Sequence, residues 1–249
     1  MRYLCFALIS FLIGQSLFAQ SPEFRVESIK PSIYVHTSYM LYSGQPFPSN
    51  GLVIETKKGV VLVDTPWDTL QTRQLLDWIS TNLKRPVLLA IITHAHDDRL
   101  AGTELLRRQG TRVICTPLTA RLAKAKNHPV PDAILPNDTT LYIGGVRIET
   151  YFPGPGHSPD NIVVWLPKQK LLFGGCLVKS VEASGLGNIA DADLSEWPAT
   201  IRRVHERFPK IDLLVPGHQS WKTNDTSIAI PFGHPALQRT INLLDRKGG

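Results

Sequence analysis

The apolar pattern of this chain predicts the same order of elements in each half, with strands first and helices after them. In the first half, β-branched runs at 52–56 and 60–64 flank the turn Lys57-Lys58-Gly59, which is typical of a β-hairpin. A helix predicted to start after Asp68, a residue that can cap it, follows these strands. Such strands and amphipathic helices must bury their apolar faces against one another. The pattern therefore predicts an α/β protein, an αββα sandwich of two packed sheets with helices on both outer faces.

The two similar halves cover about residues 22–135 and 139–249, and prolines at 129, 131 and 136 mark the linker between them. The first half is expected to hold strands near 24–29, 33–37, 52–56, 60–64, 87–92 and 112–115, with helices from Asp68, over about 98–108 and up to about 126. The second half is expected to hold strands near 140–143, 147–152, 162–166, 170–173 and 212–215, with helices over 195–208 and about 235–246. We expect residues 20–249 to form one domain.

The first 19 residues differ in composition from the rest. Arg2 precedes an almost wholly apolar stretch from Leu4 to Phe18, and Ala19 offers a small residue for cleavage. This pattern predicts a signal peptide over residues 1–19. The apolar stretch is short for a spanning helix. We expect an exported, periplasmic protein without a membrane anchor.

Charge and cysteine usage narrow the classes of function. The formal net charge is +6, but the basic residues form isolated pairs such as Arg107-Arg108 and Arg202-Arg203, not a patch suited to nucleic acid. We expect no nucleic-acid partner and a monomer. Cys115 lies in a predicted buried strand and Cys176 in a Gly-Gly-Cys turn, so we do not expect them to form a disulfide.

A cluster of metal-ligand residue types directly follows the predicted strand at 87–92. In extended chain, residues two apart point to the same side, so His94 and His96 can share one ion. The carboxylate of Asp98, two residues on, can turn to an adjacent ion. Imidazole and carboxylate suit zinc. The alternative is a polar loop whose histidines satisfy backbone groups.

Three more candidate ligands stand after other predicted strands. His157 ends a Pro-Gly-Pro-Gly-His turn, Cys176 follows the strand at 170–173, and His218 follows the strand at 212–215. Together with the first cluster they supply six ligands of zinc type at one expected edge of the sheets. The remaining histidines are expected to be non-ligands: His36, His128, His205 and His234.

On these motifs the chain resembles the metallo-β-lactamases, specifically the di-zinc subclass with a cysteine ligand. The segments that carry the resemblance are His94–Arg99, Gly156–Pro167, Gly174–Ser180, Leu186–Asn188 and Val215–His218. The resemblance implies two zinc ions per chain, one on His94, His96 and His157 and one on Asp98, Cys176 and His218. It also implies hydrolysis of the β-lactam amide by metal-bound hydroxide, which confers antibiotic resistance.

The same resemblance assigns roles beyond the metals. Asp98 would orient the nucleophile, Lys179 would anchor the carboxylate of a β-lactam, and Asn188 would polarise the lactam carbonyl. Arg99 would lie below the metals and tune them, and residues 39–51 would form a flexible loop over the substrate.

Three features depart from the common pattern of this family. Ala101 and Gln219 stand where glycine is usual, Gln219 beside a ligand that it could crowd, and residues 221–233 form a longer link than usual. Two other functions stay open. One is a thioesterase or lactonase of the same fold, although these read His-x-His-x-Asp-His, and Arg99 replaces the last histidine. The other is a non-catalytic periplasmic zinc-binding protein, which would not require Lys179 or Asn188.

Overall fold

The computed structural model of this protein describes residues 23–222 and 232–246. The predicted signal peptide and most of the link at 221–233 lie outside the described residues. Among the helices in the described ranges, none has the length and apolarity needed to cross a membrane.

Each half of the chain builds one sheet. The first sheet has six strands in chain order, β1-β2-β3-β4-β5-β6. Its first four strands are antiparallel, and β5 and β6 add in parallel. Their bounds are Arg25–Lys30, Ile33–Tyr42, Gln45–Glu55, Val60–Val63, Val87–Ile91 and Arg112–Ile114.

The second sheet has five strands, again with neighbours in the sheet adjacent in sequence, β11-β10-β9-β8-β7. Only the β10–β11 pair is parallel. Strands β7 to β11 cover Thr139–Ile143, Val146–Tyr151, Val163–Leu166, Leu171–Gly175 and Leu213–Pro216. Connections of this kind keep the strands of one half in one sheet, and no strand of one sheet pairs with a strand of the other among the described residues.

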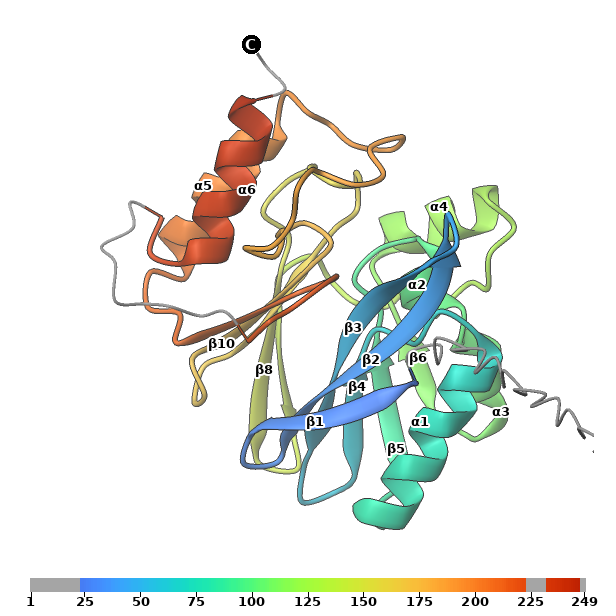
Figure 1. Ribbon diagram of the computed structural model, residues 1–249. Helices are drawn as coiled ribbons and strands as arrows, with labels where there is room; N and C mark the ends of the chain where they lie inside the picture. Colours follow the sequence, from blue (N-terminus) through green and yellow to red (C-terminus); the bar gives the residue numbers. More distant parts are fainter. Residues whose placement is uncertain (1–22, 223–231, 247–249) are drawn as a thin grey trace, which may run out of the picture.

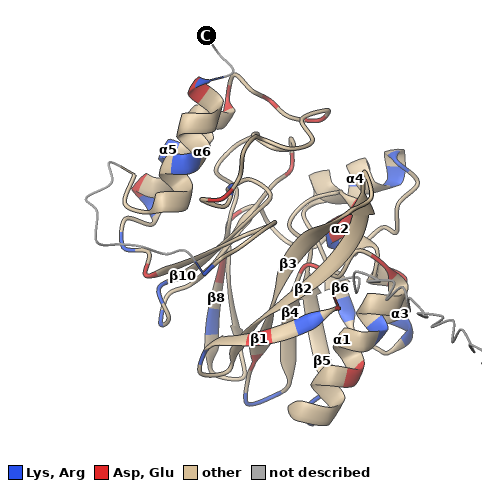
Figure 2. Cartoon of the chain, in the orientation of Figure 1, with Lys and Arg blue, Asp and Glu red and all other residues tan. Residues whose placement is uncertain are grey.

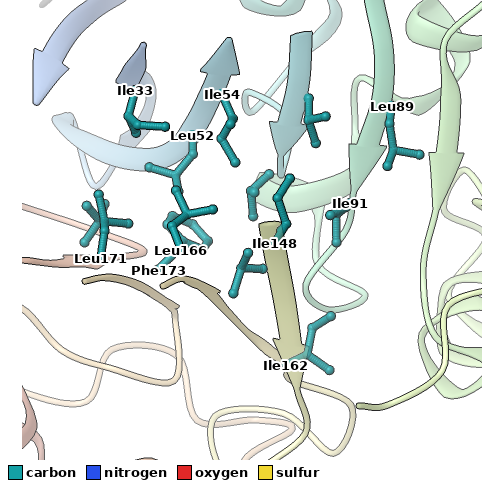
Figure 3. Close-up of a cluster of buried hydrophobic side chains, with 14 of the residues drawn as sticks. Ile33, Leu52, Ile54, Leu89, Ile91, Ile148, Ile162, Leu166, Leu171 and Phe173 are labelled. Atoms are coloured by element: carbon teal, nitrogen blue, oxygen red, sulfur yellow. The ribbon is translucent and has the colours of Figure 1, made fainter. Parts of the chain in front are cut away.

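The inner core lies between the two sheets, as Figure 3 shows. Alternate residues of β3, Leu52 and Ile54, face Ile148, Leu166 and other side chains of the second sheet, all of them buried. The intervening residue Val53 faces the other way, into a second cluster under helices of the first half. This alternation explains why the β-branched runs of the sequence are apolar throughout, since both faces of the strands are covered.

Helices cover the two outer faces (Figure 1). On the first sheet lie α1 and the short helices that follow it, and on the second lie α5 and α6. Charged residues concentrate on the helices, the turns and the edge strand β1, whereas the central strands carry few (Figure 2). The predicted αββα sandwich is confirmed. The helices α1 to α6 cover Thr69–Asn82, Asp97–Leu100, Thr103–Arg108, Pro117–Ala125, Trp197–Arg207 and Pro235–Asp245.

Several local predictions are also confirmed. Asp68 caps α1, where its Oδ1 accepts a hydrogen bond of 2.7 Å from the backbone N–H of Gln71. Pro198 falls in the first turn of α5, which needs no donor there. That helix begins at Trp197 and not at Ser195, because the Asp193 side chain binds the backbone N–H groups of residues 195 and 196 in a turn.

The prediction of one helix over 98–108 is wrong. The chain forms two short helices there, interrupted at Gly102, whose backbone N–H donates to Thr65 Oγ1 at 2.9 Å. A Cβ atom on residue 102 would lie 2.5 Å from Thr72 Oγ1, so only glycine fits. The helix is therefore interrupted where this segment passes close to α1.

The prediction of a loop at residues 39–51 is also wrong. Strands β2 and β3 extend through it and pair from Ile33↔Ile54 to Tyr42↔Gln45, joined by a tight turn at Ser43 and Gly44. Both turn residues have positive φ values, 50° and 74°. The segment is a long β-hairpin that projects past the body of the sheet (Figure 1). The prolines at 46 and 48 are tolerated because ladder donors are not needed at every position of an outlying hairpin.

Candidate metal centre

The six predicted ligands meet at one edge of the sandwich, at the ends of strands. His94 and His96 directly follow β5, and α2 carries Asp98. Cys176 follows β10 and His218 follows β11, while His157 stands on the loop between β8 and β9. Three groups of ligand atoms converge within 4.8 Å: His94, His96 and Asp98; His94, His157 and Cys176; and Asp98, Cys176 and His218.

Three imidazole nitrogens form the first cluster. His96 Nδ1 lies 3.1 Å from His94 Nε2 and 3.2 Å from His157 Nε2. A tetrahedral ion with metal–nitrogen bonds near 2.0–2.1 Å separates its nitrogens by about 3.3 Å. The three rings stand nearly perpendicular to one another, with interplanar angles of 78°, 83° and 89°. This histidine cluster has the spacing that zinc requires.

The second cluster contains one oxygen, one sulfur and one nitrogen. Cys176 Sγ lies 3.1 Å from His218 Nε2 and 3.5 Å from Asp98 Oδ2, and the last two atoms are 3.3 Å apart. Edges of about 3.3–3.6 Å are expected around tetrahedral zinc with mixed ligands. This cysteine cluster adjoins the histidine cluster, so the residues present fit two neighbouring ions.

Burial prepares the imidazoles for a metal. It lowers the pKa of His94 and His157 well below the ordinary value, and neighbouring imidazole or lysine charges lower it further. It also lowers the pKa of His218 to about 4, although Asp98 opposes this shift. Neutral imidazoles keep a lone pair for an ion. Among the four histidine ligands, His96 and His218 are the most exposed, with 18% and 19% of their side chains accessible to solvent. Solvent and small molecules therefore reach the clusters past these two residues.

The cysteine cluster rests on a buried arginine. Arg99 Nε donates to Asp98 Oδ2 at 2.8 Å, and its other nitrogens reach Asp64 Oδ2 at 3.3 Å and the Asn50 and Gly217 carbonyls. Burial alone would raise the pKa of Asp98, but Arg99 and the nearby histidines lower it well below the ordinary value. Burial raises the pKa of the Cys176 thiol, and Arg99 opposes that shift. The guanidinium thus compensates the negative charges of this cluster, as predicted for a residue below the metals.

Asn50 on β3 holds the His218 turn from the first half of the chain. Its side-chain amide donates to the Pro216 and Gln219 carbonyls at 3.0 and 2.9 Å, and its backbone N–H donates to the Gly217 carbonyl. His218 Nδ1 lies 2.8 Å from the Pro48 carbonyl, which orients Nε2 towards Cys176. Sequence reasoning missed Asn50, because nothing local distinguishes it from other polar strand residues.

Asp191 is the corresponding partner in the histidine cluster. Its Oδ2 lies 2.7 Å from His96 Nε2, and Lys126 at the end of α4 binds the same oxygen. The hydrogen bond from this lysine, and after it the one with His96, lowers the pKa of Asp191. Asp191 directs Nδ1 of His96 towards the cluster. It too was missed, although it lies three residues after the predicted Asn188.

A second carboxylate ties the two histidine-bearing segments together. Asp160 is buried, and its Oδ2 accepts from the backbone N–H of Ala95 at 2.9 Å, between His94 and His96. Its Oδ1 accepts from Ser158 Oγ at 2.8 Å, next to His157. The separation of the three imidazoles therefore depends on a contact between the two halves.

The two predicted substrate residues occupy different environments. Lys179 is 8% exposed, and burial lowers its pKa to about 8. Asn188 is exposed, and its Oδ1 accepts from the Ala190 backbone N–H at 3.0 Å in an ordinary turn. The amide nitrogen of Asn188 is the donor that could meet a carbonyl oxygen.

The β2–β3 hairpin reaches the cysteine cluster from above. Phe47 of the hairpin packs on His218, with ring centroids 4.7 Å apart. Trp67, which follows β4, contacts the same imidazole with a centroid separation of 6.2 Å. The tip residues Met40, Leu41 and Tyr42 are exposed apolar side chains. An apolar arm beside an ion cluster can cover the apolar part of a bound molecule.

The departures at 101 and 219 differ in backbone conformation. Ala101 has φ −58° and ψ −29°, which any residue adopts. Gln219 was expected to be able to crowd the cysteine cluster. Gln219 also lines a groove of about 350 Å³ with Pro46, Pro48 and Trp221. Its backbone has a positive φ of 63°, which explains why glycine would suit the position.

The four histidines predicted to be non-ligands belong to none of the ligand groups found in the described residues. His234 caps α6 through Nδ1, and His36 is buried under Gly51, where a Cβ atom would lie 2.2 Å from its Nε2. Cys115 and Cys176 are both free, as expected.

Comparison with known proteins points to one family. A model of the Metallo-beta-lactamase superfamily matches residues 44–218. The chain is 45% identical over 193 residues to the metallo-beta-lactamase type 2 of Bacillus cereus, covering 78% of this chain and 75% of the relative. It superimposes on a metallo-beta-lactamase from Pontibacter korlensis with a TM-score of 0.83 and 46% identity, covering 90% of this chain and 99% of the other. A Pseudomonas aeruginosa metallo-beta-lactamase in a mono-zinc form matches with a TM-score of 0.78 and 33% identity, covering 91% and 97%.

Proposed function

Because the chain belongs to the metallo-beta-lactamase superfamily, we propose that it hydrolyses the ring amide of β-lactam antibiotics and thereby confers resistance to them. The observation that carries this proposal is that a three-imidazole cluster and an Asp–Cys–His cluster lie next to each other at one edge of the sandwich. The relatives at 32–46% identity are named for the same activity. In the reaction, water oxygen bonds to the lactam carbonyl carbon, the ring C–N bond breaks, and the nitrogen receives a proton.

Zinc is the cofactor that the donor set favours. His94, His96 and His157 would hold one ion, and Asp98, Cys176 and His218 a second. Nitrogen, sulfur and oxygen ligands at tetrahedral spacing suit zinc better than magnesium or calcium, which prefer oxygen. When bound, zinc supplies a hydroxide nucleophile near neutral pH and an electrophile for the charge on the departing nitrogen.

The protein residues would bind and orient the substrate. Lys179 is a nearly buried cation with no carboxylate within 4.0 Å in the described parts of the chain, so it can accept the carboxylate that most β-lactams carry. Asn188 would donate to the lactam carbonyl oxygen, and Asp98 would orient the attacking water. The apolar hairpin tip would exclude bulk water above the ring.

Export would place the enzyme where β-lactams act. The charged and apolar pattern of residues 1–19 supports a signal peptide and a periplasmic location. Sequencing of the N-terminus of protein recovered from the periplasm should start near residue 20. Recovery of the full chain in the cytoplasm alone would contradict this assignment.

Turnover of nitrocefin and of a carbapenem tests the function. We expect hydrolysis of a β-lactam that a chelator abolishes and that compounds acylating an active-site serine leave intact. Hydrolysis of thioesters or lactones without β-lactams would favour the other hydrolases of this fold. Tight zinc binding without turnover of any of these substrates would favour a zinc-binding protein.

A further inference from the structure

Trp197 is the largest fully buried side chain among the described residues, and it lies at the start of α5 beside the ligand clusters. Its indole Nε1–H donates to the Leu177 carbonyl at 3.0 Å, on the stretch between Cys176 and Lys179. Its ring lies 5.9 Å, centroid to centroid, from the imidazole of His157. One side chain therefore contacts a ligand of the histidine cluster and the backbone that follows a ligand of the cysteine cluster.

The backbone around Trp197 is fitted closely to the ring. A Cβ atom on Gly156 would lie 2.6 Å from Leu177 Cδ1 and 3.0 Å from Trp197 Cδ1, so a larger residue before His157 would displace these side chains. The backbone N–H of Trp197 donates to the Asp193 carbonyl at 3.0 Å, and the N–H of Asp193 donates to the Gly156 carbonyl at 2.8 Å. These bonds hold the indole at a defined position relative to His157.

The same indole lies against the ammonium group of Lys179. Lys179 Nζ is 5.1 Å from the centre of the ring, within the range of a cation–π contact, while the lysine backbone N–H is fixed by Thr240 Oγ1 at 2.8 Å. No carboxylate lies within 4.0 Å of Nζ in residues 23–222 and 232–246. The ammonium is thus held by an aromatic face on one side and keeps its N–H donors for an anion on the other.

We propose that Trp197 is a positioning residue that holds the Lys179 ammonium where the carboxylate of the substrate binds. The role rests on the proposed β-lactam hydrolysis and deepens it. A free lysine side chain loses rotational freedom when it forms a contact. The indole face restricts it beforehand, so a carboxylate-bearing substrate binds with a smaller entropic cost. The contact selects substrates with an anion at a fixed distance from His157.

Two substitutions separate the aromatic face from the indole hydrogen bond. Trp197→Phe and Trp197→Leu both remove the donor to Leu177, but only Phe keeps a π face. We expect KM for a β-lactam acid to rise about three- to thirtyfold in Trp197→Leu and by a smaller factor in Trp197→Phe. KM for the matching methyl ester should change no more than about twofold, and zinc content should stay constant. In a Lys179→Ala background, Phe and Leu should behave alike.

Trp165→Leu is the matched control, because Trp165 packs on the same apolar cluster but stacks on Phe208, 5.1 Å away, and not on Lys179. We expect it to leave the acid-to-ester ratio unchanged. Equal losses on acid and ester in both Trp197 variants would overturn the positioning role. If Lys179→Ala itself failed to discriminate acid from ester, the carboxylate anchor of the proposed function would be wrong.

A direct reading of the contact does not depend on turnover. The ε-methylene protons of Lys179, assigned in the zinc-loaded protein with a Lys179→Arg variant, should be shifted upfield by the indole ring current. The shift should shrink in Trp197→Phe and vanish in Trp197→Leu. An unshifted lysine in the parent protein would show that the ammonium is not held by Trp197, whatever the substrate of the enzyme.

Discussion

The histidine cluster and the cysteine cluster lie side by side but are held in different ways. Two ligands of the histidine cluster, His94 and His96, sit two residues apart after one strand, and carboxylates outside the ligand set orient the chain around them. Each ligand of the cysteine cluster comes from a different segment, and a single buried guanidinium binds two of them, through Asp98 and through the carbonyl of Gly217 beside His218. The first arrangement has two of its three ligands on one short segment, whereas the second draws its ligands from three segments and depends on charge balance; both need contacts between the halves.

This difference implies unequal robustness. Loss of Arg99 would leave Asp98 and Asp64 buried without their guanidinium, whereas no single cation has that role for the three imidazoles. We therefore expect the cysteine cluster to lose its ion first under chelation or substitution. The predictions below run from the largest expected effect to the smallest.

Removal of all metal should have the largest effect. A chelator should lower β-lactam hydrolysis by more than about a thousandfold, because the residues alone supply no nucleophile of comparable strength. Metal added back stepwise should fill the histidine cluster before the cysteine cluster. With cobalt added in place of zinc, the thiolate–cobalt absorption should therefore appear only after the first equivalent has bound. Simultaneous filling of both clusters would remove the proposed difference, and full activity without metal would refute the mechanism.

Arg99→Met should be the most damaging substitution outside the ligands. It keeps much of the side-chain volume but leaves the buried carboxylates of Asp64 and Asp98 without a cation. The free energy of unfolding should therefore fall by about 3–5 kcal/mol. Chemical denaturation measures this loss. Arg107→Met, which breaks an exposed pair with Asp132, is the control and should cost no more than about 1 kcal/mol. Equal costs would show that Arg99 does not compensate the cysteine cluster.

Cys176→Ser tests the cysteine cluster alone. Serine lacks the soft, charged sulfur, so metal content should fall towards one ion per chain while the three imidazoles keep theirs. Hydrolysis should fall roughly a hundredfold, a loss typical of damaged metal sites. Elemental analysis of the purified variant gives the metal content. Two tightly held ions would mean that the second site lies elsewhere.

The pH dependence of substrate binding should follow Lys179. Burial lowers its pKa to about 8, so the ammonium is present below that pH and lost above it. KM for a β-lactam acid should therefore rise as pH increases through 8, by up to roughly ten- to a hundredfold. KM for the ester should stay flat, and Lys179→Arg, which remains charged, should abolish the rise. Parallel profiles for acid and ester would exclude Lys179 as the anchor.

Gln219→Gly should have the smallest effect. The residue holds a φ of 63°, which favours glycine, so the substitution should stabilise the fold by up to about 1 kcal/mol. Zinc affinity should not improve, because the side chain lines the groove beside the hairpin. Lys170→Gly, at φ 47° and away from the clusters, is the control and should show a similar gain in thermal unfolding. Tighter zinc binding in Gln219→Gly alone would show that glutamine crowds the site.

The parts predicted from sequence are those set by local periodicity. The apolar, β-branched run at 52–56 predicts a buried strand, and the His-x-His spacing after 87–92 predicts a shared ion. The hairpin was missed because Pro46 and Pro48 are typical of loops, although in the structure they pair with Leu41 and Tyr39 of the neighbouring strand. Asp191, Asn50 and Trp197 were missed for the same reason. Their hydrogen-bond partners are 95, 166 and 20 residues away in the chain, and the local sequence pattern does not indicate contacts at such separations.

The chain-order topology has a consequence for the timing of assembly. A polypeptide that emerges from its N-terminus can pair β1 to β6 as they appear, and the second sheet can follow in the same way. The first half alone contributes His94, His96 and Asp98, and the second contributes His157, Cys176 and His218. The first half alone brings His94, His96 and Asp98 together, but neither half contains the whole three-imidazole cluster or the whole Asp–Cys–His cluster. A nascent or truncated chain therefore completes neither of the two proposed zinc sites. Metal binding is then a late step of folding that requires the two halves to have packed together. A bound ion in turn stabilises the packed halves against separation.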